Sequence, residues 1–279
     1  MRTAVIDVGG GMRAIFGCGV FDCFLENNIT FDAAYGVSAG ASNIATFLAQ
    51  QKKRMYRFYT DYSFRKEYMS ISNFIKKGSF LDMEYIYKTL PEAEDPFDFE
   101  TFEKDETLFK MVATDGLTGE SVYFDKATIR RENNDTMRAT ASLPVINKPT
   151  VIDSVPYFDG GISDPIPFKK AIEDGADFII IILTKPQYVR RKEKDDELFV
   201  KLLKRKYPAS SEALRKRAET YNSELDEAES LVKEGRALII SPDDTFGITT
   251  TKKDRAGLEK FYAHGYEKAQ SVVDNIKLL

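Results

Sequence analysis

The residues of this chain best suited to chemistry are Gly36-Val37-Ser38-Ala39-Gly40, a Gly-x-Ser-x-Gly pentapeptide. Between a strand and a helix, this sequence is typical of a nucleophile elbow, a tight turn that pushes the serine hydroxyl out of the sheet. The two outer glycines remove side chains that would crowd the turn. The pentapeptide therefore predicts a nucleophilic Ser38. The alternative is an ordinary tight turn before a helix.

A second glycine-rich turn follows the first predicted strand and opens the first predicted helix, with the sequence Gly9-Gly10-Gly11-Met12-Arg13. Its exposed backbone N–H groups can bind a phosphate or the oxyanion of a reacting carbonyl. Arg13 either orients this turn or points into solvent. The same glycines with Ala14 satisfy a relaxed dinucleotide fingerprint, with Asp32 as its ribose-binding acid. Asp32 weakens this nucleotide alternative, because it begins the second predicted strand instead of ending it.

A third motif, Asp159-Gly160-Gly161, ends a strand predicted over residues 150–158. An aspartate in this place is held at the rim of the sheet, beside a backbone that carries no side chains. It could act there as a catalytic carboxylate. The alternative is a plain Asp-Gly turn, which is common, so Asp159 gains its weight from the two motifs before it.

The order glycine-rich turn, Gly-x-Ser-x-Gly and Asp-Gly-Gly resembles that of the patatin-like acyl hydrolases of bacterial type, a family of lipid hydrolases. The resemblance covers at least residues 3–183. It implies a Ser–Asp dyad without histidine, in which Ser38 is the nucleophile and Asp159 takes its proton. It also implies that the turn from Gly9 to Arg13 forms the oxyanion hole. The family usually has glycine where this chain has Ala14, a small change that should preserve the turn.

His264 is the only histidine of the chain, and it tests the rival catalytic arrangement. The order Ser38, Asp159, His264 is that of an α/β-hydrolase triad. The last predicted helix, however, places the histidine between Lys260 and Lys268, on its polar face. We therefore expect a solvated structural histidine, which favours the dyad over the triad.

The predicted elements alternate between strand and helix, with a strand over 3–8, a helix over 13–27, a strand over 31–35 and a helix over 39–51. That order implies a parallel sheet with helical crossovers. Later predicted elements are strands over 109–115, 120–125, 150–158, 178–183 and 237–240, and helices over 135–142, 167–174, 211–234 and 254–276. With the resemblance, they predict a three-layer α/β/α fold with a mostly parallel sheet. We expect a patatin-like domain over 1–185 and a mainly helical extension over 186–279, packed on the same domain.

Two charged segments outside these motifs also allow predictions. Residues 54–90 interleave aromatic residues with Lys and Arg. Because aromatic rings favour lipid–water boundaries, this composition suits a wall for an acyl chain or a lid at a membrane, and the simpler alternative is a cover for the core and the sheet edge. Residues 190–196 are a mixed run of charges, for which we expect a solvated loop.

The composition narrows the setting of the protein. A net charge of −4 gives no reason to expect nucleic acid as a partner. No apolar stretch is long enough to span a membrane, and Asp7 and the glycines interrupt the first apolar run, unlike in a signal peptide. Cys18 and Cys23 fall on different faces of one predicted helix, so we expect reduced packing residues and a cytoplasmic setting. No metal-binding cluster is visible, so we expect neither metal nor cofactor.

Together these features predict a serine hydrolase of acyl lipids or simple esters, of phospholipase, lysophospholipase or esterase type. Peripheral contact with a membrane is compatible with such a function. Two alternatives come from other classes. One is a nucleotide-binding enzyme that uses Gly9 and Gly11, and the other is a catalytically silent lipid-binding protein on a hydrolase fold.

Overall fold

A single sheet of eight strands runs through the centre of the computed structural model, which describes residues 1–279 apart from the side chains of Ile71, Lys76 and Lys77. Seven strands follow one another across it in the order β5 (Thr150–Ile152), β6 (Val155–Asp159), β3 (Leu108–Asp115), β2 (Ala33–Val37), β1 (Thr3–Asp7), β7 (Phe178–Ile182) and β8 (Ala237–Ile240). The eighth, β4 (Ser121–Asp125), pairs with β3.

The middle of this sheet is parallel. β1 pairs in parallel with β2 and β7, and the parallel arrangement extends to β3 on one side and β8 on the other. The strands β4, β5 and β6 form the antiparallel edge. Parallel strands are covered on both faces, and the continuous apolar sequence of β7 and the full burial of β2 fit that position. The predicted mostly parallel sheet is confirmed.

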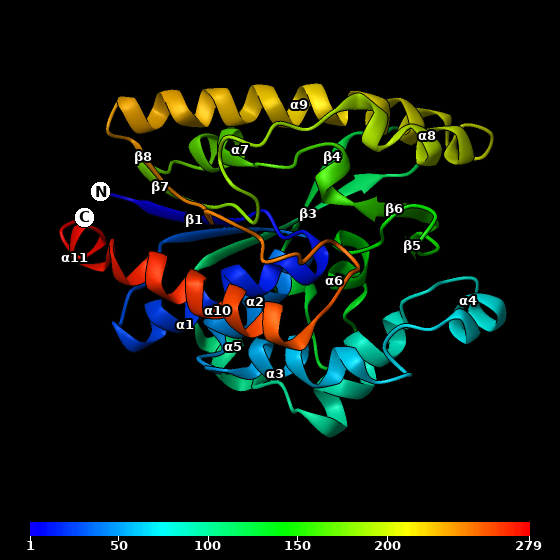
Figure 1. Ribbon diagram of the computed structural model, residues 1–279, viewed down its shortest axis with the longest axis horizontal. Helices are drawn as coiled ribbons and strands as arrows, with labels where there is room; N and C mark the ends of the chain where they lie inside the picture. Colours follow the sequence, from blue (N-terminus) through cyan, green and yellow to red (C-terminus); the bar gives the residue numbers. More distant parts are fainter.

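Helices cover both faces of the sheet and complete the three layers (Figure 1). On one face lie α7 (Phe168–Glu173), α8 (Glu197–Leu203) and α9 (Pro208–Lys233). On the other lie α1 (Ile15–Glu26), α2 (Ala39–Leu48), α3 (Arg54–Thr60), α5 (Phe99–Lys104), α6 (Asp135–Thr140) and α10 (Arg255–Gln270). The remaining helices are α4 (Ile71–Lys77), which projects from the body, and α11 (Val273–Ile276) at the C-terminus.

The C-terminal hundred residues are built into this fold. The strand predicted over residues 237–240 is β8 of the central sheet. The helix α10 packs on α1 at close range, because Gly19 and Gly265 leave room for backbone contact between them. A Cβ at Gly19 would overlap the carbonyl oxygen of Tyr262, and one at Gly265 would overlap that of Phe16. The segment beyond residue 185 therefore supplies both a strand and a covering helix.

The aromatic and basic segment mainly covers the core. Tyr59, Tyr68 and Tyr85 are buried within the main hydrophobic cluster. Short helical turns over Tyr62–Phe64 and Tyr85–Glu94 continue the cover. Among the described residues of this segment, the exposed large apolar side chains are Phe64, in the first of these turns, and Phe74 and Ile75 of α4. A membrane contact there stays a prediction.

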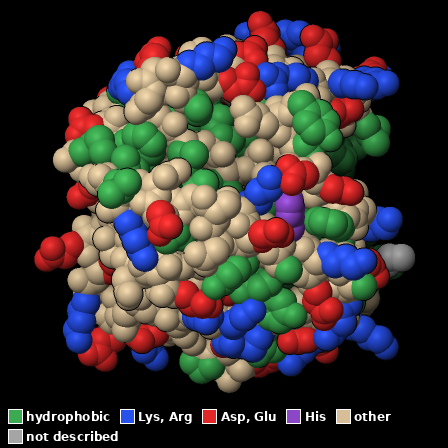
Figure 2. All heavy atoms as spheres, turned by 60° about the vertical axis from the view of Figure 1, so that its left-hand side comes forward, with side chains coloured by type: hydrophobic (Ala, Val, Ile, Leu, Met, Phe, Trp, Pro, Cys, Tyr) green, Lys and Arg blue, Asp and Glu red, His purple; other side chains and the backbone are tan. Residues whose placement is uncertain are grey.

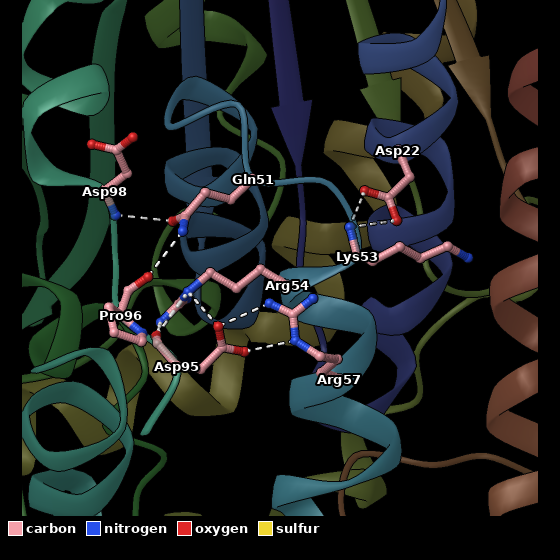
Figure 3. A network of polar contacts seen from close by, with 8 residues as sticks. All are labelled: Asp22, Gln51, Lys53, Arg54, Arg57, Asp95, Pro96 and Asp98. Atoms are coloured by element: carbon pink, nitrogen blue, oxygen red, sulfur yellow. Dashed lines mark hydrogen bonds and ion pairs between the residues drawn. The ribbon is translucent and has the colours of Figure 1, made fainter. Parts of the chain in front are cut away.

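Polar contacts fasten α3 to its surroundings (Figure 3). Arg57 binds the Asp95 carboxylate through two hydrogen bonds of 2.8 and 3.0 Å. Arg54 donates to the Asp95 carbonyl oxygen at 2.8 Å. Just before the helix, the Lys53 amide donates to Asp22 of α1 at 3.1 Å. The buried guanidinium of Arg54 thus has a close oxygen acceptor, as a buried charge requires.

Candidate active site

Ser38 stands on a strained turn between β2 and α2. Its backbone has φ 57° and ψ −131°, a combination that costs a non-glycine residue on the order of 1–3 kcal/mol. The turn is tight: a Cβ at Gly40 would overlap the Asp7 carbonyl oxygen, and one at Gly36 would overlap the backbone of Ala41. The Ser38 amide donates to Thr140 Oγ1 at 2.9 Å. The predicted elbow geometry is therefore present, with Ser38 lining the main cavity.

Asp159 ends β6 at the same cavity. Its Oδ1 accepts the Gly161 amide at 2.9 Å, whereas Oδ2 is buried and has no hydrogen-bond partner among the described residues. Burial raises the pKa of the Asp159 carboxyl group, and the nearby Ser38 hydroxyl, Arg217 and Gly161 partly offset that rise. No well-aligned hydrogen bond joins Ser38 to Asp159 in this resting state, in which such contacts are commonly loose. The Asp159 carboxyl group and the Ser38 hydroxyl therefore lie close together in one cavity.

The glycine-rich turn lies against the elbow. Gly9, Gly10 and Gly11 have φ values of 64°, 121° and 62°, which side chains rarely permit. A Cβ at Gly9 would overlap the carbonyl oxygen of Val37, the residue before Ser38. Three consecutive glycines thus bring the backbone of this turn directly alongside the serine.

Two backbone amides of the glycine-rich turn are available to donate hydrogen bonds to an oxyanion. The Gly9 amide donates to Asp7 Oδ1 at 2.8 Å, and the Met12 amide donates to the Thr250 carbonyl at 3.1 Å. Among the described residues, the amides of Gly10 and Gly11 have no acceptor. This narrows the expected oxyanion donors from the whole turn to these two groups.

Asp7 connects the turn to the helix behind Ser38. Its carboxylate accepts the Gly9 amide through Oδ1 and the Asn43 side-chain amide of α2 through Oδ2, each at 2.8 Å. Burial raises the pKa of Asp7 to about 6, although both hydrogen bonds act against the rise. This role could not be predicted from the sequence, because an aspartate after an apolar strand is also common in plain turns.

The cavity that holds these groups has a volume of about 940 Å³. Four cationic side chains from separate segments also line it and are called its basic side below: Arg13, Lys185, Arg191 and Arg217. The carboxylates of Asp195, Asp196, Asp243 and Asp244 line the cavity as well. The expected solvated loop over residues 190–196 is wrong for Arg191 and Asp196, whose side chains are only 15% and 8% exposed. Both are held by α9, where Arg217 contacts Asp196 and Asn222 binds the backbone of Arg191.

Arg13 belongs to this basic side. Its Nη1 donates to Thr250 Oγ1 at 3.1 Å, so it neither binds the carbonyls of the turn nor points into solvent. Burial, together with Arg191 and Arg217, lowers the pKa of Arg13 to about 10. The C-terminal segment therefore contacts the glycine-rich turn twice, through Thr250 on Arg13 and on Met12.

His264 lies outside the cavity lining. Its Nε2 accepts the Asp243 amide at 3.0 Å, and its ring packs between Phe16 and Phe246 at 5.9 and 5.7 Å. The side chain is only 14% exposed, so the expected solvated histidine is wrong, although a small part reaches the surface beside acidic groups (Figure 2). No described contact joins it to Ser38 or Asp159, which leaves the triad without its base.

The nucleotide-binding alternative requires Asp32 as a ribose-binding acid near the glycine-rich turn, and the structure places it elsewhere. Asp32 accepts the backbone amide of Thr3 at 2.7 Å and the Thr3 hydroxyl at 3.2 Å. Thr3 begins β1, whereas the glycine-rich turn follows the other end of that strand. A ribose held near Gly9 would therefore be a full strand away from Asp32.

The described part of the chain contains neither a metal cluster nor a membrane-spanning helix. Among the described residues, no group of three or more His, Cys, Asp or Glu side chains could hold a metal ion. None of the described helices is long and apolar enough to cross a bilayer. Cys18 and Cys23 are both buried and free of disulfides.

Comparison with known proteins agrees with this architecture. The model of the patatin-like phospholipase family matches residues 8–172, and a domain family of unknown function matches residues 207–279. The uncharacterized protein YjjU of Escherichia coli (strain K12) is 27% identical over 208 residues, which are 69% of this chain and 57% of that protein. The chain thus spans little more than half the length of this relative.

A solved structure extends the similarity to almost the whole chain. The crystal structure of VipD from Legionella pneumophila matches 98% of this chain and 67% of its own, with a TM-score of 0.54 and 12% identity. At that identity the match supports the fold alone. The family model covers more than half of the chain and includes both the serine elbow and the Asp-Gly-Gly turn. The chain therefore belongs to the patatin-like phospholipase family, whose members are lipid acyl hydrolases.

Proposed function

We propose that the protein hydrolyses carboxylic esters of acyl lipids, with Ser38 as the nucleophile and Asp159 as its base. One observation carries the proposal. Ser38 with its strained backbone and Asp159 line one cavity beside the amides of Gly10 and Gly11, and among the described residues neither these amides nor Asp159 Oδ2 have a hydrogen-bond partner. A nucleophile, a base and an oxyanion donor pair are the parts that acyl transfer requires.

The first half of the reaction forms an acyl-enzyme. Ser38 Oγ attacks the ester carbonyl carbon while its proton passes to Asp159 Oδ2. The carbonyl oxygen becomes an oxyanion that accepts hydrogen bonds from the amides of Gly10 and Gly11. When the intermediate collapses, the bond to the alcohol breaks, and the alcohol oxygen takes the proton from Asp159. The acyl group is left on Ser38.

The second half repeats these steps with water. Asp159 accepts a proton from a water molecule as its oxygen attacks the acyl-enzyme carbonyl carbon. The same two amides hold the second oxyanion. The bond to Ser38 Oγ then breaks, the serine recovers its proton from Asp159, and the carboxylic acid leaves. The carboxylate must be basic enough for both transfers, and burial raises its pKa in that direction.

The cavity also has an apolar part suited to an acyl chain. Its apolar lining comes from both halves of the chain: Leu143, Pro144, Ile146, Phe199, Leu214 and Ile248. Removing an acyl chain from water here is favourable by about 0.8 kcal/mol for each buried methylene. A lipid ester is therefore a better fit than a small polar ester.

A covalent probe tests the nucleophile directly. A fluorophosphonate should label the wild-type protein and not Ser38→Ala, and hydrolysis of medium-chain acyl esters should be lost in parallel. Labelling of a folded Ser38→Ala protein, or equal hydrolysis by both proteins, would show that another residue is the nucleophile. A folded wild-type protein that neither reacts with the probe nor cleaves any ester would instead favour a silent lipid-binding protein.

A further inference from the structure

We propose that the basic side of the cavity is a phosphate subsite that makes the enzyme specific for esters carrying an anionic phosphate group. The subsite consists of Arg13, Lys185, Arg191 and Arg217, called the cationic cluster below. The inference rests on the proposed hydrolase function, because it specifies the charge of the substrate that this active site would accept. It predicts a preference for phosphomonoester and other anionic headgroups over neutral or cation-bearing ones.

The cationic cluster reaches the catalytic groups from two directions. The Nη2 atom of Arg13 lies 3.0 Å from where a Cβ of Gly10 would stand. On the other side, Nη2 of Arg217 lies 3.5 Å from where a Cβ of Gly161 would stand. Gly10 belongs to the oxyanion turn and Gly161 follows Asp159, so one guanidinium flanks each half of the proposed machinery. A phosphate bound between them would belong to the molecule being cleaved.

Ion pairs neutralise the cationic cluster only in part, although Asp195 also acts electrostatically on Lys185 and Asp159 on Arg217. Asp196 is the one carboxylate that forms ion pairs with it among the described residues, and it is shared between Arg191 and Arg217 at 3.4 Å each. The Nε atoms of Arg13, Arg191 and Arg217 are buried and have no acceptor in the described chain. Buried donors without acceptors are costly. Three unpaired guanidinium nitrogens around one cavity point to an anion as their ligand.

The mutual repulsion of the four cations supports the same conclusion. Arg191 and Arg217 lower the pKa of Arg13, and Arg13, Arg191 and Arg217 together add to the effect of burial on Lys185, whose pKa falls to about 8. Like charges gathered in a partly desolvated cavity repel one another strongly. A phosphate group relieves that repulsion and matches the planar donor fork of arginine.

Several arginines outside the cavity have shorter ion pairs, although Arg138 also has a buried Nε without a partner among the described residues. Arg57 of α3, for comparison, binds the Asp95 carboxylate through two hydrogen bonds no longer than 3.0 Å (Figure 3). In the described part of the chain, Arg191 and Arg217 share one carboxylate at 3.4 Å each, and Arg191 also lies 5.8 Å from the centre of the Tyr221 ring, although Arg217 is just 17% exposed. The chain can satisfy a structural guanidinium, and it leaves these two incompletely bonded.

Phosphate binding can be measured without catalysis in the Ser38→Ala protein. Calorimetric titration with inorganic phosphate should give saturable binding, which Arg217→Gln should weaken by about ten-fold or more, the range expected for losing a hydrogen bond to a charged group. Arg215→Gln is the matched control, because Arg215 lies on the same helix with its side chain 60% exposed and paired to Glu212. No binding to Ser38→Ala, or equal binding by Arg217→Gln and Arg215→Gln, would overturn the subsite.

A comparison of two substrates tests whether the subsite binds the phosphate of a lipid headgroup or only a free phosphate ion. With one acyl chain throughout, the ratio of kcat/KM for lysophosphatidic acid to that for monoacylglycerol should fall about ten-fold or more in Arg217→Gln and stay constant in Arg215→Gln. Binding of inorganic phosphate with an unchanged ratio would overturn the assignment to substrate. If Arg217→Gln does not fold, Lys185→Met takes its place in both measurements. Ester hydrolysis by Ser38→Ala would overturn the nucleophile and leave the titration as an independent test.

Discussion

The two sides of the cavity are held in place by different means. On one side, backbone conformation positions the chemistry: three glycines with positive φ, a strained Ser38 and an aspartate at a strand end. On the other, long side chains from Lys185, Arg191 and Arg217 meet without any unusual backbone. An unusual backbone geometry restricts which residue types are allowed, and it can therefore be recognised in the sequence as a motif. A charged subsite built from side chains of distant segments leaves none.

The largest expected effect lies on the side of the cavity that the three sequence motifs form, called the motif side below. Ser38→Ala and Asp159→Asn should each lower kcat by on the order of 10³-fold or more. The nucleophile and its base act as one unit, so the loss of either removes most of its contribution to the rate. Asparagine keeps the shape of Asp159 and its acceptor for Gly161, but it cannot take a proton. Steady-state kinetics on a medium-chain ester give the measurement. Full activity of Asp159→Asn would show that the base lies elsewhere and would remove the distinction between the two sides.

A smaller effect tests whether the glycine turn acts through its backbone. Gly9→Ala should lower kcat by about 10²-fold, the cost of losing oxyanion donors, because its Cβ would push the turn away from Val37. Gly235→Ala is the control, since Gly235 has a similar φ of 72° and a Cβ there would meet nothing within 4 Å. Both variants carry the same type of backbone strain, so equal kinetics would refute a role for the position of the turn.

The fold and the motif side were largely predictable from sequence. The apolar run of β7, the strand β8 and the order of the first elements follow from periodicity and turn residues, and all three are present. The strand β2 begins at Ala33, two residues later than predicted, and the Asp32 side chain accepts the Thr3 amide of β1. That contact joins two segments, and periodicity does not contain it.

The basic side was missed for a physical reason. Residues 190–196 have the composition of a solvated loop, and only the contacts of Arg191 and Asp196 with α9 bury them. Arg217 offered one usable signal. It lies on the helix face of Leu214 and Tyr221, three residues after the first and four before the second, so it is a cation on an apolar stripe. A charge in that position is expected to face a partner or a cavity.

The pH dependence of catalysis should report on the electrostatic link between the two sides. Asp159 must be deprotonated to act, so kcat/KM for a neutral ester should rise with pH through its pKa. Arg217 lowers that pKa, and Arg217→Gln should therefore move the rising limb to higher pH. Arg215→Gln should leave the limb in place. An unshifted limb in Arg217→Gln would mean that the cationic cluster does not influence the base.

A second pH effect should appear with anionic substrates. The pKa of Lys185 is lowered to about 8 by burial and by its arginine neighbours. Below that pH the lysine is charged, and above it the charge is lost, so KM for lysophosphatidic acid should rise as the pH passes through about 8. KM for monoacylglycerol should not follow. Lys185→Met should remove this dependence, and its persistence in that variant would assign the titration to another group.

The smallest expected effect concerns His264, and it tests whether a third group completes the motif side. His264→Leu removes the acceptor of the Asp243 amide, so it should lower stability by about 1 kcal/mol and Tm by roughly 2–4 °C. Activity per folded molecule should stay at the wild-type value, because the ring packs between Phe16 and Phe246 away from the cavity. Lys268→Gln, which removes a different contact to Asp243, is the control for stability. Normal Tm with lost esterase activity in His264→Leu would restore the triad, and the C-terminal segment would then supply a catalytic base as well as the anion subsite.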